Sequence, residues 1–385
     1  MLESYIIDWK NYTLRNRTIF KLFTNARRRY YLIMAPALQF ELSQPPTDAI
    51  SSLAFAPGTP TRLLAASWDK HVYLYDTSDH EARGTLIQKF EHRAPVLDVC
   101  FGASDNEAFT GGVDFQVKRI NLQNGEQTVV GAHRAPVKSV VHSKDHSLLF
   151  SASWDSTLQI YDLENLNRDA TKIKLPAKPH SMSVTATKLV VAMASRLVHI
   201  YEISTIKSAL ADANSSTCEI EPWQQRESSL KFMTRSVACM PSDAGYACSS
   251  IEGRIAVEWF DPSVDSQARK YAFKCHRQAD SEGNGIDIVY PVNAVEFHPI
   301  FGTFASGGGD GIVALWDAEA KRRIRQYQKY PAAIAALSFS CDGNYLAIGV
   351  CPGYEDGQES YSGEGSTHVF VRELGPNEAK GKRSK

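Results

Sequence analysis

The amino-acid sequence predicts an all-β protein, a seven-bladed β-propeller that is closed by an N-terminal strand. Two observations lead to this prediction. A segment of about 30 residues returns seven times at a spacing of roughly 40 residues, and each copy alternates short apolar strands with tight turns. Apolar residues at helical spacing are nearly absent from 37 to 375. We therefore expect one propeller over 37–375, with one four-stranded blade for each copy.

The copies share one order of features. An apolar strand ends in a turn with Pro, Asp or Gly, and a second strand ends in small residues. A tight turn with an Asp follows, and a third strand ends in an aromatic-Asp pair or a remnant of one. The four clearest copies are 48–77, 94–123, 135–164 and 290–319. Three weaker copies are 178–204, 233–262 and 330–374.

The last copy supplies only three strands before the chain leaves the repeat. The segment 38–42 precedes the first copy and alternates apolar with polar residues. Because a propeller must close to remove its free sheet edge, we expect this segment to become the outer strand of the last blade. Two long polar connectors, at 205–224 and 276–288, interrupt the repeat.

The two ends of the chain differ from the repeat. Residues 1–33 carry seven basic and two acidic residues, with no continuous apolar run of the signal-peptide type. A mitochondrial presequence is one interpretation, although the acidic residues and the low serine content argue against it. We favour a basic leader that is untranslated or disordered, with Met34 as a second start. The charged tail, 376–385, is expected to be disordered.

Composition excludes several classes of protein. The net charge is −1, which gives no signal for a nucleic-acid-binding polyelectrolyte. No run reaches the roughly 18 apolar residues that a membrane span needs. The 7 cysteines are scattered without a Cys-x-x-Cys pair, so we expect buried thiols in a reducing compartment and no zinc site.

No catalytic motif stands out. The chain has neither a phosphate-binding loop with Lys-Ser/Thr nor a Gly-x-Ser-x-Gly or His-Glu-x-x-His motif. The glycine run at 307–311 falls where the repeat turns between strands, so turn geometry explains it. The acidic loop at 354–359 lacks the spacing of calcium ligands. We therefore expect no enzyme activity, no cofactor and no metal.

The aromatic-Asp endings resemble those of the WD-repeat family. In that family a His before the first strand and an Asp in the tight turn tie each blade together. The resemblance implies that His92 serves Asp114 and that His133 serves Asp155. Both pairs are expected to be structural, because a buried carboxylate needs partners. Several copies lack the His.

One rim of the propeller carries both the tight turns and the entries to the first strands. The basic and aromatic residues that map to this rim are Trp68, Arg93, Arg134, Arg196, Arg235 and Arg254. Arginine pairs well with carboxylate and phosphate groups, although each could instead pair with a neighbouring acid or lie in solvent. We predict that Trp68 anchors a peptide. Arg235 and Arg254 are predicted to receive its negative groups, with Lys274 as a weaker candidate.

Three stretches resemble one branch of the WD-repeat proteins. The runs at 226–235, 249–258 and 271–277 are similar to those of the mitotic spindle-checkpoint propellers, the budding-uninhibited-by-benzimidazole type. The messenger-RNA-export propellers of nuclear pores are near cousins that share Ile-Glu-Gly-Arg and Phe-Lys-Cys-His-Arg. Ser-Trp-Asp at 67–69 favours the checkpoint branch. The basic leader and the long connector at 205–224 depart from the family pattern.

The resemblance implies a non-catalytic adaptor of the spindle assembly checkpoint. Such an adaptor binds acidic GLEBS motifs of a checkpoint kinase and its pseudokinase relative, and phosphorylated Met-Glu-Leu-Thr-type repeats of a kinetochore scaffold. It acts in the nucleus and at kinetochores in mitosis, with no membrane and no direct nucleic-acid contact expected. The alternative is an RNA-export adaptor at the nuclear pore. A ubiquitin-ligase substrate receptor would need a docking helix or a further domain, and none is visible.

Overall fold

The structure is a computed structural model that describes residues 39–165, 168–212, 220–279, 285–353 and 367–381. The chain divides into two units, Met1–Ala37 and Leu38–Lys385. All described residues belong to the second unit. The predicted leader at 1–33 and the acidic loop at 354–359 lie outside the described residues.

The described residues form seven four-stranded antiparallel sheets and one two-stranded sheet. The first three sheets, each given from its inner to its outer strand, are β2 (Ile50–Phe55), β3 (Arg62–Ser67), β4 (His71–Asp76) and β5 (Thr85–Glu91); β6 (Val96–Phe101), β7 (Glu107–Gly112), β8 (Gln116–Asn121) and β9 (Gln127–Ala132); and β10 (Val137–Ser143), β11 (Leu148–Ser153), β12 (Thr157–Asp162) and β13 (Thr171–Lys174).

The other four-stranded sheets follow the same order. They are β14 (Pro179–Val184), β15 (Lys188–Met193), β16 (Leu197–Glu202) and β17 (Gln224–Glu227); β18 (Thr234–Cys239), β19 (Gly245–Ser250), β20 (Arg254–Trp259) and β21 (Tyr271–Lys274); β24 (Val292–Phe297), β25 (Thr303–Gly308), β26 (Val313–Asp317) and β27 (Arg322–Gln326); and β28 (Ile334–Phe339), β29 (Tyr345–Val350), β30 (His368–Glu373) and β1 (Gln39–Glu41).

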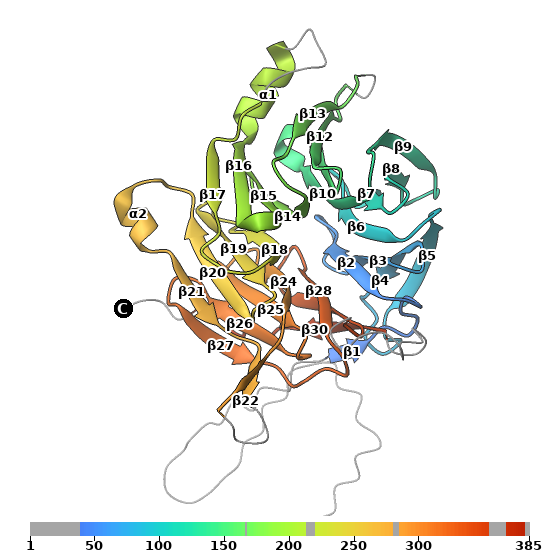
Figure 1. Ribbon diagram of the computed structural model, residues 1–385. Coiled ribbons are helices and arrows are strands. Elements are labelled where there is room, and N and C mark those ends of the chain that lie inside the picture. The colour runs from blue at the N-terminus through green and yellow to red at the C-terminus, as the bar shows by residue number, and fades with distance from the viewer. Residues whose placement is uncertain (1–38, 166–167, 213–219, 280–284, 354–366, 382–385) are drawn as a thin grey trace, which may run out of the picture. The chain divides into compact units, whose positions relative to one another are not determined.

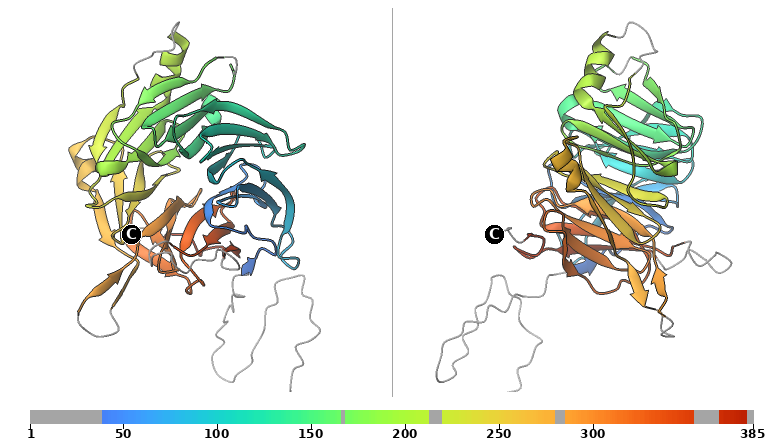
Figure 2. Two further views of the ribbon diagram at one scale, coloured as in Figure 1. Left: turned by 45° about the vertical axis from the view of Figure 1, so that its right-hand side comes forward. Right: turned by 60° about the vertical axis from the view of Figure 1, so that its left-hand side comes forward.

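The sheets form a ring. The inner strand of each sheet contacts the inner strand of the next, and the inner strand of the last sheet, β28, contacts that of the first, β2. The left view of Figure 2 shows the sheets arranged around the axis of this ring. The prediction of a seven-bladed β-propeller is therefore confirmed.

The burial pattern explains why these segments become strands. Every residue of β11, β19 and β25 is buried, because the second strand of a sheet is covered on both faces by the neighbouring sheets. In the outer strand β5, exposed residues alternate with less exposed ones, and only Phe90 is buried. The hydrophobic core thus lies between adjacent sheets, which is why the second strands consist of apolar and small residues.

The last sheet joins the first described strand, β1, to the last three strands, β28, β29 and β30. Strand β1 pairs antiparallel with β30, with Phe40 opposite Val371. Phe40 and Leu42 are buried, and the Leu42 N–H donates to the Val369 carbonyl at 2.8 Å. The Tyr330 hydroxyl also donates to the side-chain oxygen of Gln39 at 2.8 Å. Residues 39–42 therefore lie beside β30, at the outer edge of the last sheet.

The prediction of a disordered tail is wrong for residues 376–381. The Glu378 side chain is only 4% exposed, and its carboxylate pairs with Arg372 at 3.1 Å and with Arg325 at 3.6 Å. The Ala379 carbonyl accepts a hydrogen bond from the Thr303 hydroxyl at 2.7 Å. Burial of the Glu378 carboxylate is possible because Arg325 and Arg372, from earlier strands, pair with it. The charged composition of the tail does not show that these partners are within reach. Residues 382–385 lie outside the described residues.

Both predicted connectors contain regular structure. The first begins in helix α1 (Ile203–Asp212), which buries Ile203, Ile206 and Leu210 at helical spacing against the core of the third and fourth sheets. The second contains the hairpin β22 (Arg277–Ala279) and β23 (Asp287–Val289), which projects from the ring (Figure 1). A short helix, α2 (Val264–Ala268), follows β20. None of the helices within the described ranges is long and apolar enough to cross a membrane.

Candidate peptide-binding rim

The strand register of the fifth sheet brings the predicted basic residues to one edge. Thr234 of β18 lies opposite Ser250, Ser250 lies opposite Arg254, and Arg254 lies opposite Lys274. This row crosses the sheet at the end that carries the β19–β20 turn. We call this end of the ring, where second strands turn into third strands, the turn rim. Arg235, which follows Thr234, therefore lies at the turn rim together with Arg254 and Lys274.

Arg254 is already paired within the chain. Its Nε lies 3.5 Å from Glu252 Oε2, and its side chain stays 33% exposed. Glu252 also accepts a hydrogen bond from the Lys231 N–H at 3.2 Å. Glu258, the other acid that could have paired with Arg254, pairs with Arg226 at 3.7 Å. An anionic ligand would therefore share the Arg254 guanidinium with Glu252.

Arg235 and Lys274 are more open than Arg254. Both side chains are exposed, and Arg235 Nη2 donates to the Asn293 side-chain oxygen of the next sheet at 3.0 Å. The Lys274 side chain forms no hydrogen bond or ion pair with the described residues, although its backbone pairs with Arg254. The uncompensated ammonium of Lys274 makes it a stronger candidate for anion binding than the sequence suggests.

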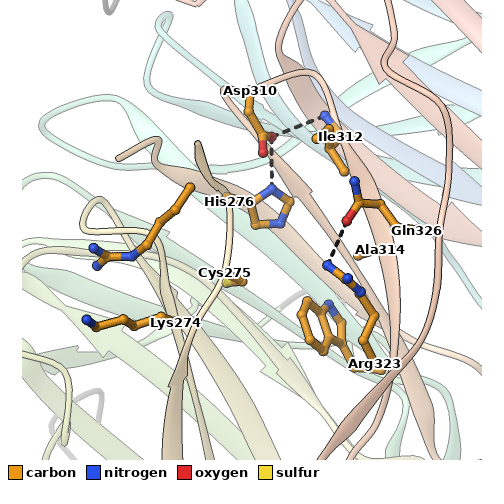
Figure 3. A pocket seen from close by; sticks show the side chains of 10 residues that line it. Lys274, Cys275, His276, Asp310, Ile312, Ala314, Arg323 and Gln326 are labelled. Carbon is orange, nitrogen blue, oxygen red and sulfur yellow. Dashed lines mark hydrogen bonds and ion pairs between the residues drawn. The ribbon is translucent and has the colours of Figure 1, made fainter. Parts of the chain in front are cut away.

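Lys274 lines a pocket of about 220 Å³ between the fifth and sixth sheets. Its lining includes Cys275, His276, Ala314 and Trp316, together with the basic residues Lys274, Arg277 and Arg323. Figure 3 shows Lys274 and Arg323 on opposite sides of His276. Arg323 donates to the Gln326 side-chain oxygen at 2.6 Å. The turn rim thus continues into a small pocket with a basic margin.

The side of this pocket contains a buried hydrogen-bond network. His276 Nδ1 lies 2.9 Å from Asp310 Oδ1, and His276 Nε2 lies 2.8 Å from the Ser306 hydroxyl. The Trp316 indole donates to the same hydroxyl at 2.8 Å. The side chains of His276 and Asp310 are each 1% exposed. This network ties β21, β25 and β26 together and is the best-formed His–Asp pair of the described residues.

His276 was not predicted from the sequence as a structural residue. The His precedes its Asp by 34 residues here, whereas His133 precedes Asp155 by only 22. The difference arises because the β22–β23 hairpin is inserted between His276 and the first strand of the sixth sheet. The available signal was that His276 stands two residues after the end of outer strand β21, much as His133 directly follows outer strand β9.

His133 and Asp155, which the sequence predicts as a pair, are in contact at a longer distance than His276 and Asp310. His133 Nδ1 lies 3.5 Å from Asp155 Oδ2, and its ring nitrogens bond to the Ser151 and Thr157 hydroxyls at 2.7 and 2.9 Å. Burial lowers the pKa of His133 below its usual value, against the opposing effect of Asp155. Burial alone would raise the pKa of Asp155, but hydrogen bonds from Thr157 and the Arg134 N–H outweigh it and lower that pKa.

The predicted pair His92–Asp114 is wrong. His92 bonds to the Thr110 hydroxyl at 3.0 Å and to the Phe90 carbonyl at 3.1 Å. Asp114 pairs instead with Lys118, whose ammonium lies 3.1 Å away. Burial lowers the pKa of His92 to about 4, so the imidazole is neutral at pH 7 and needs no carboxylate. The lysine at the i+4 position replaces the histidine as the partner of the carboxylate.

Apolar side chains accompany the basic ones on the turn rim. Trp68, in the β3–β4 turn, is 37% exposed. Phe115 lies in the β7–β8 turn, Met233 precedes β18, and Ile251 lies in the β19–β20 turn; they are 40%, 41% and 39% exposed. Only Trp68 was predicted from the sequence, because the repeat gives no expectation of apolar residues at the other three positions. A face that combines apolar and cationic groups suits an acidic peptide with apolar anchors.

Another arginine of the turn rim has a partner. Arg196, in the β15–β16 turn, pairs with Glu227 of β17. No group of three or more His, Cys, Asp or Glu side chains within the described ranges could hold a metal ion.

Comparisons with known proteins assign the family. The family "WD domain, G-beta repeat" matches residues 38–76, 125–162 and 289–317. The mitotic checkpoint protein BUB3.1 of Arabidopsis thaliana is 42% identical over 91% of this chain and 96% of its own length. The mitotic checkpoint protein bub3 of Dictyostelium discoideum is 38% identical over 87% of this chain and 94% of its own length. A Poly(A)+ RNA export protein of Schizosaccharomyces pombe is 34% identical, over 80% of this chain and 83% of its own length. This chain therefore belongs to the Bub3 family of mitotic checkpoint WD-repeat proteins.

Proposed function

We propose that this protein is a non-catalytic adaptor of the spindle assembly checkpoint. Its turn rim binds acidic GLEBS-type motifs of checkpoint kinases and phosphorylated Met-Glu-Leu-Thr-type repeats of a kinetochore scaffold, and so brings the kinases to kinetochores in mitosis. The observation that carries the proposal is the edge of the fifth sheet where Arg254 lies opposite Lys274 and Arg235 follows Thr234 of the same row, in a chain of the checkpoint family.

Charge explains why such a site would distinguish phosphorylated from unmodified peptide. A phosphothreonine carries about −1.5 to −2 charges at neutral pH, and an unmodified threonine carries none. Glu252 Oε2 already lies 3.5 Å from Arg254 Nε. The neutral hydroxyl of an unmodified threonine would therefore add little favourable interaction with this guanidinium. A phosphate can compete with the carboxylate and contact Lys274 as well. Hydrogen bonds to charged groups contribute roughly 1.5–3 kcal/mol each, enough for about tenfold or more in affinity.

Removing either arginine should abolish the preference for phosphate. We expect wild type to bind a phosphorylated Met-Glu-Leu-Thr-type peptide at least about tenfold more tightly than its unmodified form, because of the charge-assisted bonds. Arg235→Ala and Arg254→Ala should each bind the two forms almost equally. Isothermal titration calorimetry with both peptides measures this ratio.

Arg196→Ala is the matched control, because Arg196 lies on the same rim but is held by Glu227. It should keep the wild-type ratio. An unchanged ratio in Arg235→Ala or Arg254→Ala would remove that residue from the site. Failure of wild type to bind either peptide would remove the proposed function itself.

Trp68 is expected to anchor the peptide by apolar contact. Truncating an interface tryptophan commonly costs ~2 kcal/mol or more, so Trp68→Ala should weaken peptide binding by about 30-fold. The melting temperature should stay within a degree or two of wild type, since the side chain is 37% exposed. Val129→Ala, an exposed apolar position on the outer strand β9, should change neither quantity. A large drop in melting temperature for Trp68→Ala would show instead that Trp68 packs its own blade.

The export function is the second candidate, and similarity to an RNA-export protein favours it. That identity is lower, at 34% against 42% for the checkpoint relative, and it covers less of the chain. A pulldown with the GLEBS-type peptides of the two kinds of partner separates the candidates. Selective capture by the checkpoint-kinase peptide supports the adaptor function, and selective capture by the pore-protein peptide supports export.

A further inference from the structure

The chain continues past the last sheet at the end of the ring opposite the turn rim. Residues 375–381, which we call the tail segment, follow β30 and reach the sixth sheet, where the Thr303 hydroxyl at the start of β25 donates to the Ala379 carbonyl at 2.7 Å. The segment belongs to no strand, and the Glu378 N–H bonds within it, to the Gly375 carbonyl at 2.9 Å. The tail segment therefore joins two blades without forming a β-ladder with either.

Glu378 holds the tail segment by charge. Its side chain is 4% exposed, and its Oε1 accepts hydrogen bonds from Arg372 Nε at 3.2 Å and from Arg372 Nη2 at 3.1 Å. Arg325 Nη1 lies 3.6 Å from the same oxygen. The Arg372 side chain is 15% exposed, and its guanidinium carbon lies 4.1 Å from the centroid of the Tyr327 ring. A neutral side chain in place of the carboxylate would leave this cation largely buried without its partner, so the surface is selective for an acid.

The two residues after Glu378 differ in the space around them. Ala379 is 2% exposed and belongs to the core cluster that contains Leu374 and Tyr327. A larger side chain at this position would have to displace packed neighbours, which destabilises a core. Lys380 is exposed, so its position accepts side chains of any size.

The position of Gly381 has no room for a side chain. A β-carbon added to Gly381 would lie 2.5 Å from Asp317 Oδ2, well inside the contact distance of non-bonded atoms. Asp317 is 6% exposed, and its Oδ1 accepts a hydrogen bond from the Ala320 N–H at 2.9 Å, which holds the carboxylate in place. The four positions of 378–381 therefore favour an acid, a small residue, any residue and a glycine, in that order.

We propose that the surface beneath the tail segment is a peptide-binding site for the pattern Glu-Ala-x-Gly. Residues 378–381 occupy this site in cis, and a segment of a partner protein with the same pattern competes with them. The tail segment can give way because no β-ladder breaks when it leaves and its charged contacts come from one carboxylate. We call this surface the tail site; it is formed by Thr303, Asp317, Arg325, Tyr327 and Arg372. Because it lies at the end of the ring opposite the turn rim, the inference does not depend on the proposed function.

The test measures binding of a labelled peptide to the full chain. The probe is Gly-Pro-Asn-Glu-Ala-Lys-Gly, the sequence of 375–381, with fluorescein at its N-terminus. Glu378→Lys should expel the tail segment, because it places a third cation beside Arg325 and Arg372. Fluorescence anisotropy should rise to saturation with Glu378→Lys and stay flat with wild type, whose site is filled by the covalently linked segment at high effective concentration.

Peptide variants test the pattern, and a second charge reversal is the matched control. The peptide with Gln in place of Glu should bind Glu378→Lys at least about tenfold more weakly, because it lacks the charge-assisted hydrogen bonds. The peptide with Trp in place of Ala should not bind, and the peptide with Ala in place of Lys should keep its affinity. Glu373→Lys reverses the charge of an exposed acid at the end of β30, so it should behave as wild type.

Two binding results would overturn the tail site. One is flat anisotropy with a Glu378→Lys protein that still melts cooperatively, and the other is equal affinity for the Glu and Gln peptides. If Glu378→Lys does not fold, hydrogen exchange of wild type decides instead. The Glu378 amide should exchange at least about tenfold faster than the amides that pair β30 with β29, because the tail segment opens locally. Exchange as slow as that of β30 would show that the segment is a fixed part of the fold and would overturn the proposal.

Discussion

Deleting residues 1–44 is expected to abolish the soluble, folded protein. The deletion removes β1 and, with it, the buried side chains of Phe40 and Leu42. Burial of each such side chain stabilises the fold by about 1.5–3 kcal/mol. The loss also exposes the paired edge of β30, whose unpaired backbone groups can then pair with other chains. Size-exclusion chromatography should show aggregates, and thermal melting should show no cooperative transition.

Deleting only residues 1–33 is the control for this experiment. Because this deletion leaves 38–42 in the chain, the melting temperature should equal that of the full chain. A stable monomer lacking residues 1–44 would show that closure does not depend on β1. A damaging effect of the shorter deletion would show that the leader contributes to the fold, contrary to the prediction from its composition.

Replacing Asp310 by Ala is expected to destabilise the protein by roughly 3–5 kcal/mol, which is a large part of the stability of most domains. The substitution leaves His276, which is 1% exposed, without its acceptor at 2.9 Å. It also removes the acceptor of the Ile312 N–H at 3.1 Å. Urea denaturation followed by tryptophan fluorescence measures the change in the free energy of unfolding.

The double variant and a second pair provide the controls. The double variant Asp310→Ala, His276→Ala should lose less free energy of unfolding than the two single variants together, because the second substitution removes the buried side chain that the first leaves without a partner. Asp155→Ala should cost less than Asp310→Ala, since Asp155 is 12% exposed and lies 3.5 Å from His133. Additive effects in the first pair, or equal costs in the two aspartate variants, would contradict this assignment of buried partners.

The sequence by itself determined the fold and the rim. Seven copies at a regular spacing specify seven blades, because each copy contains its own strands and turns and these depend on local residues. The order of strands within a copy then assigns every turn to one end of the ring. That is why the sequence places Arg235 and Arg254 on one rim. The register of the fifth sheet adds Lys274, which lies opposite Arg254, to the same edge.

Only the tertiary structure decided which side chains became partners. His276 reaches Asp310 across an inserted hairpin, Asp114 takes Lys118 in place of His92, and Glu378 of the supposed tail is buried against two arginines. Repeat periodicity specifies backbone positions, whereas an ion pair depends on which charged group lies within a few ångströms. That distance is set by the packing of one blade against another and not by any local pattern.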